Sequence, residues 1–405
     1  MALDLRPFGQ LFAEPTRNGL TRPKAVRGAG TKMVNMGELF ANPRIQNIEM
    51  DRVPLSEDES HRYLLEAGDL LFARQSLVLE GAGKCSIFLG DHEPVTFESH
   101  VTRVRLNKEE ADPRFYYYWL QSHDGRAAIK SIVEQGAGAA GIRGSDLQTL
   151  DVAWCPVKRQ TSIADILGTL DDKIELNRRM NETLEAMARA IFKSWFVDFD
   201  PVRAKASELI AEGTLQIGDG YRAKNEELGT YGVPFIRAGE LNNGFDTVNA
   251  ERLKPDRLLA AKGKLSIVGD VAFTSKGTIG RFARVAEHTE PFVYSPQVCF
   301  WRSLRPEIIH PAVLYCWMQS GEFVSQIDGV AGQTDMAPYV SLRDQKAMEV
   351  PRFHESQGQV GESIVPLLRL ISEKQAESLN LANLRDTMLP KLLSGGLPTK
   401  TNRSH

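Results

Sequence analysis

The sequence contains little cysteine and no long apolar segment. Four of its 405 residues are cysteine, and they stand far apart without a C-x-x-C pair or a histidine cluster: Cys85, Cys155, Cys299 and Cys316. A zinc site needs closely spaced ligands, so we predict buried free thiols and no metal site. No segment approaches the roughly 18 apolar residues of a membrane span, and the first residues lack a signal sequence. These absences predict a cytoplasmic chain that makes no membrane contact.

The motifs of common catalytic sites are also missing. A phosphate-binding loop requires G-x-x-x-x-G-K-[ST], but Cys85 follows the Gly83-Lys84 pair. The second proline of an adenine methyltransferase motif, Asp/Asn-Pro-Pro-Tyr/Phe, is absent at residues 42–44 and at residues 112–115. The eight histidines are scattered. The sequence therefore predicts no catalytic residue and no cofactor bound by this chain.

An excess of basic charge is missing overall but present locally. The net charge is −3, which argues against indiscriminate binding to nucleic acid. Residues 1–35 nevertheless hold six basic and two acidic side chains, and residues 251–284 hold eight basic and three acidic ones. Residues 36–69 hold eight acidic and three basic side chains. One basic patch therefore falls in each half of the chain.

The chain repeats itself after about 200 residues. V-N-M-G-E-L-F at residues 34–40 is matched by I-R-A-G-E-L at residues 236–241, and the Gly-Asp pair at residues 68–69 by one at residues 269–270. Y-W-L-Q-S at residues 118–122 is matched by C-W-M-Q-S at residues 316–320. The matches keep one order at nearly one offset, so they predict two copies of one unit.

Each copy ends in the pattern of a long helix, with apolar residues at alternating spacings of four and three. The predicted helix seam consists of Ile163, Leu167, Leu170, Ile174, Leu184, Ile191 and Trp195 in the first copy and Val360, Ile364, Leu367, Ile371, Leu381, Met388 and Leu392 in the second. Asn177 and Asn181 interrupt the first seam, where they would fix its register. Thr161 or Ser162 would cap the first helix. In the second copy the helix begins near Pro366 or is kinked there.

The segments before these helices have mixed character. Short strands are expected at residues 70–73, 101–106, 269–274 and 298–301, and one buried helix per copy at residues 115–121 and 312–319. We predict an α/β (α+β) fold with two similar globular lobes, each followed by a long helix. The predicted domains are two lobes, two helices and a tail, at residues 1–157, 158–200, 201–355, 356–394 and 395–405.

Recognition of DNA is the function that the loops favour. Arginine and lysine pair with phosphates or guanine edges, and glutamine pairs with adenine. The two copies carry such residues in matched loops, which favours contact with DNA over a merely solvated surface. The predicted DNA-binding residues are Arg17, Arg22, Lys24, Arg27, Arg74, Gln75, Lys84, Gln135 and Arg143 in the first copy and Ser275, Lys276, Thr278, Arg281, Gln333 and Thr334 in the second.

Residues 159–202, which begin R-Q-T-S-I-A-D-I-L-G-T-L, resemble the central conserved helix of the specificity subunits of type I restriction-modification enzymes. L-P-K-L-L-S-G-G-L at residues 389–397 resembles the end of that family's distal conserved helix, and G-V-P-F-I-R-A-G-E-L at residues 232–241 resembles the opening of its target-recognition domain. The resemblance covers nearly the whole chain.

The resemblance implies that each lobe reads half of a split target in double-stranded DNA. The two helices would form an antiparallel coiled coil with pseudo-twofold symmetry that sets the gap between the half-sites. Two methylation subunits would bring S-adenosylmethionine, and restriction subunits would bring ATP and Mg. The alternative is a coiled-coil scaffold whose lobes bind protein, favoured by the overall acidity. Binding to random duplex at two salt concentrations separates the two hypotheses, because phosphate contacts release counterions.

Overall fold

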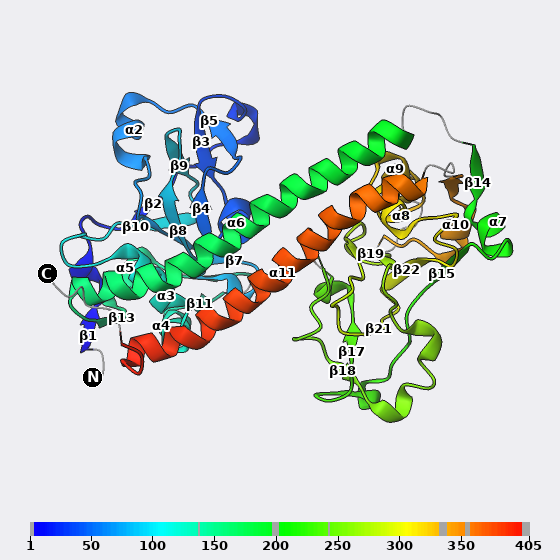
Figure 1. Ribbon diagram of the computed structural model, residues 1–405. Helices are drawn as coiled ribbons and strands as arrows, with labels where there is room; N and C mark the ends of the chain where they lie inside the picture. The colour runs from blue at the N-terminus through cyan, green and yellow to red at the C-terminus, as the bar shows by residue number, and fades with distance from the viewer. Residues whose placement is uncertain are drawn as a thin grey trace, which may run out of the picture. The chain divides into compact units, whose positions relative to one another are not determined.

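The computed structural model describes residues 4–136, 138–196, 202–241, 244–331, 338–352 and 357–398 (Figure 1). Contacts divide the chain into two compact units. The first unit holds residues 1–174 and 380–405, and the second holds residues 175–379. Each unit therefore contains one globular lobe and half of each long helix. The described helices include none that is long and apolar enough to cross a membrane.

The first lobe is built on a sheet that, in its described part, has the strand order β2-β10-β6-β8-β4. Helices α3 (Pro113–Gln121) and α4 (His123–Ser131) share its hydrophobic core. The strands of this sheet are β2 (Arg17–Asn18), β10 (Val101–Val104), β6 (Leu70–Ala73), β8 (Cys85–Gly90) and β4 (Arg44–Gln46). The lobe is completed by β1 (Asp4–Pro7), β3 (Thr31–Val34), α1 (Met36–Ala41), β5 (Asp51–Val53), α2 (Glu57–Tyr63), β9 (Val95–Phe97), α5 (Gly144–Thr149) and β13 (Asp151–Trp154).

The second lobe repeats this plan. Its sheet has the order β15-β22-β19-β20 in the described residues, and α8 (Pro311–Met318) and α9 (Gly321–Ala331) share its core. The strands are β15 (Leu215–Gly218), β22 (Val298–Ser303), β19 (Val271–Thr274) and β20 (Phe282–Arg284). The remaining elements are β14 (Arg203–Lys205), α7 (Ala206–Ala211), β16 (Leu228–Gly229), β17 (Val233–Ile236), β18 (Arg252–Leu253), β21 (Val293–Tyr294), α10 (Leu342–Ala347) and β23 (Glu349–Pro351).

These elements confirm the mixed α/β class and the short strands and buried helices predicted in each copy. All four cysteines are buried and free, as predicted. The long helices extend over Val157–Phe196 (α6) and Gln357–Ser394 (α11). The division into recognition domains with ends at residues 157, 200, 355 and 394 stays a prediction.

The repeated Gly-Asp pair has a structural role, first seen in the first lobe. The buried Asp69 carboxylate accepts the backbone N–H of Glu66 at 2.8 Å. It also accepts two hydrogen bonds from Arg105, through Nε and Nη2, each at 2.7 Å. The same guanidinium donates to the carbonyl of Leu64 at 3.2 Å. This buried ion pair therefore joins the turn before β6 to the residue that directly follows β10.

The second lobe contains the same network. Asp270 accepts the N–H of Ile267 at 2.9 Å and two hydrogen bonds from Arg302, at 2.6 and 2.7 Å. Arg302 in turn donates to the carbonyl of Leu265 at 2.9 Å. Each partner lies 197 to 201 residues after its equivalent in the first lobe. The repeat read from the sequence is thus confirmed at the level of individual hydrogen bonds.

A buried glutamine in the first turn of each long helix fixes a lobe to that helix. Gln160 Oε1 accepts the N–H of Asp112, the N-cap of α3, at 2.8 Å. Gln357 Oε1 accepts the N–H of His310, the N-cap of α8, at 2.6 Å. The glutamines lie 197 residues apart and are almost completely buried. Each lobe is therefore oriented by the same contact on its own helix.

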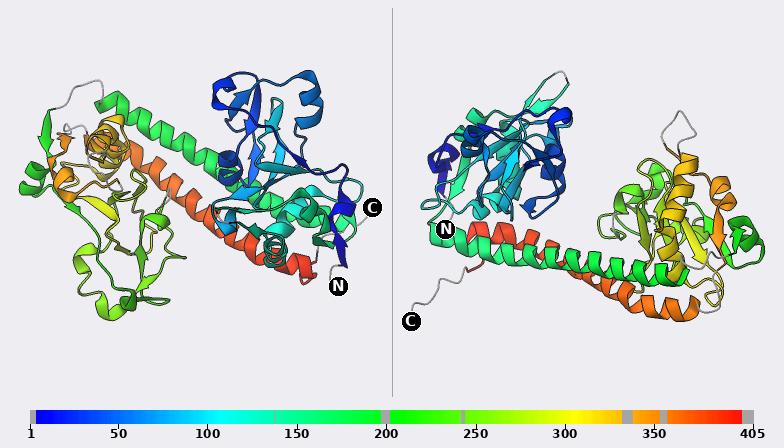
Figure 2. Two further views of the ribbon diagram at one scale, coloured as in Figure 1. Left: turned by 180° about the vertical axis from the view of Figure 1, so that it is seen from behind. Right: turned by 90° about the horizontal axis from the view of Figure 1, so that it is seen from above.

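The two long helices pack antiparallel to each other within each unit (Figure 2). In the first unit Arg385 Nη1 donates to Asp171 Oδ1 at 2.6 Å. In the second unit Asn177 Nδ2 donates to Ser378 Oγ at 3.2 Å. A later residue of α6 thus contacts an earlier residue of α11, as expected for antiparallel helices. Asn177 is completely buried, which agrees with its predicted place in the seam.

The predicted seam needs correction towards the ends of the helices. Trp195 was placed in it wrongly, because its side chain is 46% exposed while Phe192 and Phe196 are buried. A straight helix drifts about 20° per heptad from a strict 3.5-residue repeat, and the lobes cover neighbouring faces as well. In α11, Leu368 and Leu389 are correspondingly more buried than the predicted Leu367 and Met388. The other predicted seam residues are buried (Ile163, Leu167, Val360, Ile364, Ile371 and Leu392) or half-buried (Leu170, Ile174, Leu184, Ile191 and Leu381).

The predicted caps of the first helix, and the alternative that the second helix begins near Pro366, were wrong. Helix α6 begins at Val157, so Thr161 and Ser162 lie inside it and do not cap it. Helix α11 already starts at Gln357 and continues through Pro366. Helix α11 ends as many helices do, with a glycine in the left-handed conformation: Gly395 directly follows the helix and has φ of +79°.

Candidate DNA interface

The two predicted DNA-binding loops of the first lobe are brought together in a small sheet. Strand β7 (Gln75–Ser76) pairs with β12 (Ala140–Gly141), which pairs with β11 (Glu134–Gln135). Gln75 lies opposite Gly141 and Gln135 opposite Ala140. Arg143 follows β12 and forms an exposed ion pair with Glu134 at 2.6 Å. Gln75, Gln135 and Arg143 are all exposed at this sheet, although they are up to 68 residues apart in the sequence.

Arg74 and Lys84 lie at the base of the same loop and have structural partners. Arg74 Nη1 donates to the carbonyl of Ser99 at 3.4 Å. Lys84 Nζ donates to the carbonyl of Phe40 at 3.0 Å and lies 5.1 Å from the centre of its ring. Both side chains are only half-exposed. Their contact with DNA stays a prediction, but the exposed side chains of the sheet are better placed for it.

The second lobe has an equivalent loop after β19. Lys276 forms an isolated bridge with Tyr339, as Gln75 pairs with Gly141 in the first lobe. Lys276, Thr278 and Arg281 are exposed. Ser275 was wrongly chosen as a DNA contact, because it is completely buried and its hydroxyl accepts the thiol of Cys299 at 3.2 Å. Among the other predicted residues, Gln333 and Thr334 lie outside the described residues.

Three of the six basic residues near the N-terminus form ion pairs with acidic residues of the first lobe. Arg22 forms an ion pair with Glu59 at 2.6 Å, and Arg27 forms one with Asp51 at 3.0 Å. Lys24 is exposed, whereas Arg17 lies half-buried over the ring of Tyr63. The acidic segment 36–69 therefore offsets much of the local charge of residues 1–35.

The basic patch at residues 251–284 is balanced in the same way. Ion pairs join Arg252 to Glu290 at 2.9 Å and Lys264 to Asp219 at 2.6 Å. Burial lowers the pKa of Arg284. The exposed basic residues of this patch include Lys276 and Arg281 in the loop after β19.

The thiols of this chain are poor nucleophiles. Burial raises the pKa of all four cysteines and brings that of Cys316 to about 12. The thiolate is the reactive form, so these side chains stay unreactive at neutral pH. In the part of the chain that the structure describes, no three His, Cys, Asp or Glu side chains gather as metal ligands.

Comparison with known proteins identifies part of the chain. Residues 23–186 match the family model described as "Type I restriction modification DNA specificity domain". These residues are therefore similar to a type I specificity domain. They include the first lobe from β3 onward and most of α6, so the family match covers the loop sheet described above.

Curated relatives extend the similarity. The HindI specificity subunit of Haemophilus influenzae is 32% identical over 177 residues, which are 44% of this chain and 38% of that protein. The MjaIX specificity subunit of Methanocaldococcus jannaschii is 24% identical over 81% of this chain and 78% of its own length. The chain therefore spans well under half of the first relative and most of the second.

A solved structure shows the same fold over both lobes. The crystal structure of the S subunit of a type I restriction-modification system from M. genitalium has a TM-score of 0.54 and 17% identity. It covers 99% of this chain, and the match takes in 97% of that chain. The similarity shows that the chain, including the second lobe and α11, shares the fold of that structure.

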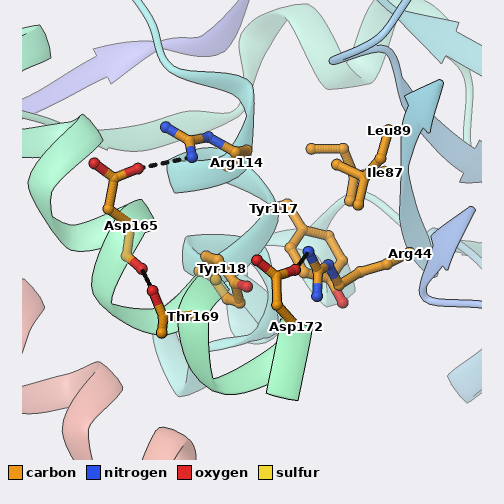
Figure 3. Close-up of a pocket in the computed structure, with 10 residues that line it drawn as sticks. Arg44, Ile87, Leu89, Arg114, Tyr117, Tyr118, Asp165, Thr169 and Asp172 are labelled. Atoms are coloured by element: carbon orange, nitrogen blue, oxygen red, sulfur yellow. Dashed lines mark hydrogen bonds and ion pairs between the residues drawn. The ribbon is translucent and has the colours of Figure 1, made fainter. Parts of the chain in front are cut away.

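Within the matched residues 23–186, two ion pairs hold the lobe against α6 (Figure 3). Arg44 of β4 reaches Asp172 at 2.5 Å, and Arg114 of α3 reaches Asp165 at 2.8 Å. They flank a small groove whose floor includes the ring of Tyr117. Sequence reasoning missed these pairs, since it considered the two Pro-Arg segments only as incomplete methyltransferase motifs.

A buried junction adds the end of α11 to this contact. Asp171 of α6 accepts the hydroxyl of Tyr118 at 2.7 Å and the guanidinium of Arg385 at 2.6 Å. Burial and the adjacent Asp171 carboxylate raise the pKa of Tyr118, so its hydroxyl keeps its proton. The first lobe, which carries the loop sheet, is thus fixed to α6 and to the end of α11.

Proposed function

We propose that this chain is the DNA-recognition subunit of a type I restriction-modification complex. Each lobe reads one half-site of a bipartite target, and the helix pair sets the gap between them. The observation that carries the proposal is the matched loop in each lobe: the loop with exposed Gln75, which lies beside Gln135 and Arg143, is matched in the second lobe by the loop with exposed Lys276 and Arg281. The specificity domain at residues 23–186 and the specificity-subunit relatives support it.

The chain recognises DNA and leaves the reactions to its partners. Two methylation subunits carry S-adenosylmethionine and modify adenine, and restriction subunits carry ATP and Mg for cleavage. A base inside a duplex is unreachable, so the methylated adenine must be flipped out while the lobes hold the flanking DNA. The complex works in the cytoplasm, where the chromosome is.

The proposal is tested by mapping methylated adenines in a genome with and without this gene. The expected result is a split motif whose methylation disappears with the gene. A Gln135→Ala change is expected to relax one position of a single half-site, and Lys276→Ala to weaken binding and reduce its salt dependence by about one phosphate contact. Arg305→Ala, at an exposed residue paired with Glu307, is the control and leaves both unchanged.

Duplex binding by the same complex distinguishes the DNA-reading proposal from the hypothesis of a protein-binding scaffold. A DNA reader loses affinity for random duplex steeply as salt rises, because it releases counterions. If the chain, with its methylation subunits present, binds no duplex at low salt, the proposal is wrong and the scaffold hypothesis is favoured.

A further inference from the structure

An apolar tip projects beside the loop sheet of the first lobe. Leu77 and Val78 follow β7 directly, and their side chains are 90% and 60% exposed. Gln75, two residues before Leu77, is exposed on the same strand. A single exposed leucine is ordinary, but this one stands next to the polar side chains that the proposed function assigns to DNA.

The loop that carries this tip is well ordered by its own contacts. The N–H of Val78 donates to Ser76 Oγ at 3.2 Å, and the N–H of Gly81 donates to the carbonyl of Val78 at 3.1 Å. Gly81 is buried so tightly that a Cβ there would lie 2.2 Å from Ser76 Oγ. The base of the loop is therefore packed, and Leu77 lies exposed outside it.

The second lobe has an equivalent tip. Thr278 stands two residues after Lys276, as Leu77 stands two residues after Gln75, and both pairs follow the bridge described above. Thr278 is exposed, and Gly277 beside it has φ of +83°, which makes the turn. The shared property of the two tips is an exposed methyl group next to a polar side chain.

We propose that Leu77 contacts the C5 methyl group of a thymine in the half-site of the first lobe, and that the methyl group of Thr278 does the same in the other half-site. The inference rests on the proposed function and names how its loops read sequence. In the major groove thymine alone among the four bases presents a methyl group, and apolar side chains recognise it there. Glutamine beside the tip is suited to the hydrogen-bonding edge of an adjacent adenine.

The test uses the complex of this chain with its methylation subunits and a duplex carrying the mapped target. Each thymine of the two half-sites is replaced in turn by uracil, which lacks only the methyl group. At one thymine the wild-type complex is expected to lose affinity about fourfold, the equivalent of one methylene-sized group at about 0.8 kcal/mol. The Leu77→Ala complex binds the thymine and uracil duplexes equally at that position.

Two further variants sharpen the result. Leu5→Ala, at a residue of β1 that is 67% exposed, is the matched control and keeps the wild-type preference for thymine. In the second lobe Thr278→Ser is expected to remove the preference at one thymine of the other half-site, whereas Thr278→Val keeps it.

The outcomes separate this inference from the proposed function. If Leu77→Ala keeps the full difference between thymine and uracil, or if no uracil substitution weakens the wild-type complex, the methyl contact is overturned. The proposed function then still stands, because target-specific binding is measured with the same duplexes. If the complex binds the target no better than random duplex, both are overturned.

Discussion

Removal of the buried carboxylate from the second lobe is expected to cost more stability than the same change in the first. Asp270 is completely buried and accepts the N–H of Ile267, the hydroxyl of Tyr294 at 2.9 Å and both hydrogen bonds from Arg302. Asp270→Ala leaves a mostly buried guanidinium without its carboxylate and a buried phenol without its acceptor. Breaking one half of a buried pair costs 3–5 kcal/mol in general, so we expect a loss of about 4 kcal/mol.

The equivalent change in the first lobe leaves more partners behind. Arg105 also contacts Glu66 at 2.6 Å and Glu14 at 3.0 Å, and no tyrosine hydroxyl donates to Asp69. After Asp69→Ala the guanidinium thus keeps two carboxylates, and the chief loss is the acceptor for a backbone N–H. An unsatisfied buried group costs 1–3 kcal/mol, so the expected loss is about 2 kcal/mol.

Native-state hydrogen exchange on the full chain measures both losses in place. The opening free energy of amides in β19 is expected to fall by about 4 kcal/mol in Asp270→Ala, while that of amides in β6 stays unchanged. In Asp69→Ala the opening free energy of amides in β6 is expected to fall by about 2 kcal/mol, while that of amides in β19 stays unchanged. Asp270→Asn keeps an acceptor and is expected to lose less than Asp270→Ala. Equal losses from the two alanine variants would refute the reasoning that the remaining carboxylates compensate.

Three other predictions concern the helices, an N-cap and the thiols. Inserting seven residues after Ile174 and seven before Asn380 lengthens each helix by about 10.5 Å. The gap between the two half-sites should then widen by about three base pairs. An unchanged gap in the methylated motif would contradict this prediction. Burial lowers the pKa of His310, whose Nδ1 accepts an N–H of α8, so the second lobe should lose stability as pH falls below about 6.5. His310→Asn keeps a side chain that can cap α8, so the melting temperature should depend less on pH in this variant. An unchanged pH dependence would show that another group causes it. Cys316 and the other thiols should react with a thiol reagent at pH 8 only after unfolding, and reaction of the native chain within seconds would show that one is accessible.

The sequence predicts the duplicated architecture well because the repeat is carried by residues with local roles. The Gly-Asp pair before each central strand and the apolar residues of the long helices repeat at nearly one offset. Asn177 was correctly placed in the seam, since a polar residue in an apolar stripe is visible from spacing alone. Trp195 was misplaced, because the drift of the helix and the cover supplied by the lobe depend on tertiary packing.

The candidate interface was harder to predict because its parts come from distant segments. The sheet of β7, β12 and β11 joins residues about 60 positions apart, and no spacing rule pairs them. The basic patch near the N-terminus was overestimated for the same reason. Arg22 finds Glu59 37 residues away, and the local count of charges cannot include that contact.

The duplication alone does not explain why α6 pairs with α11 and not with another copy of itself. The charged residues between the two helices give the reason. Asp171 is buried in the first unit and is neutralised there by Arg385 of α11. The positions 197 residues away are Leu368 for Asp171 and Ala188 for Arg385, both apolar and buried in the second unit. If α6 paired with a second copy of α6 in place of α11, Ala188 would lie where Arg385 lies now. The buried carboxylate of Asp171 would then have no cation beside it. Because such an unpaired charge costs several kcal/mol, roughly, the pairing of α6 with α11 follows from where the two copies have diverged.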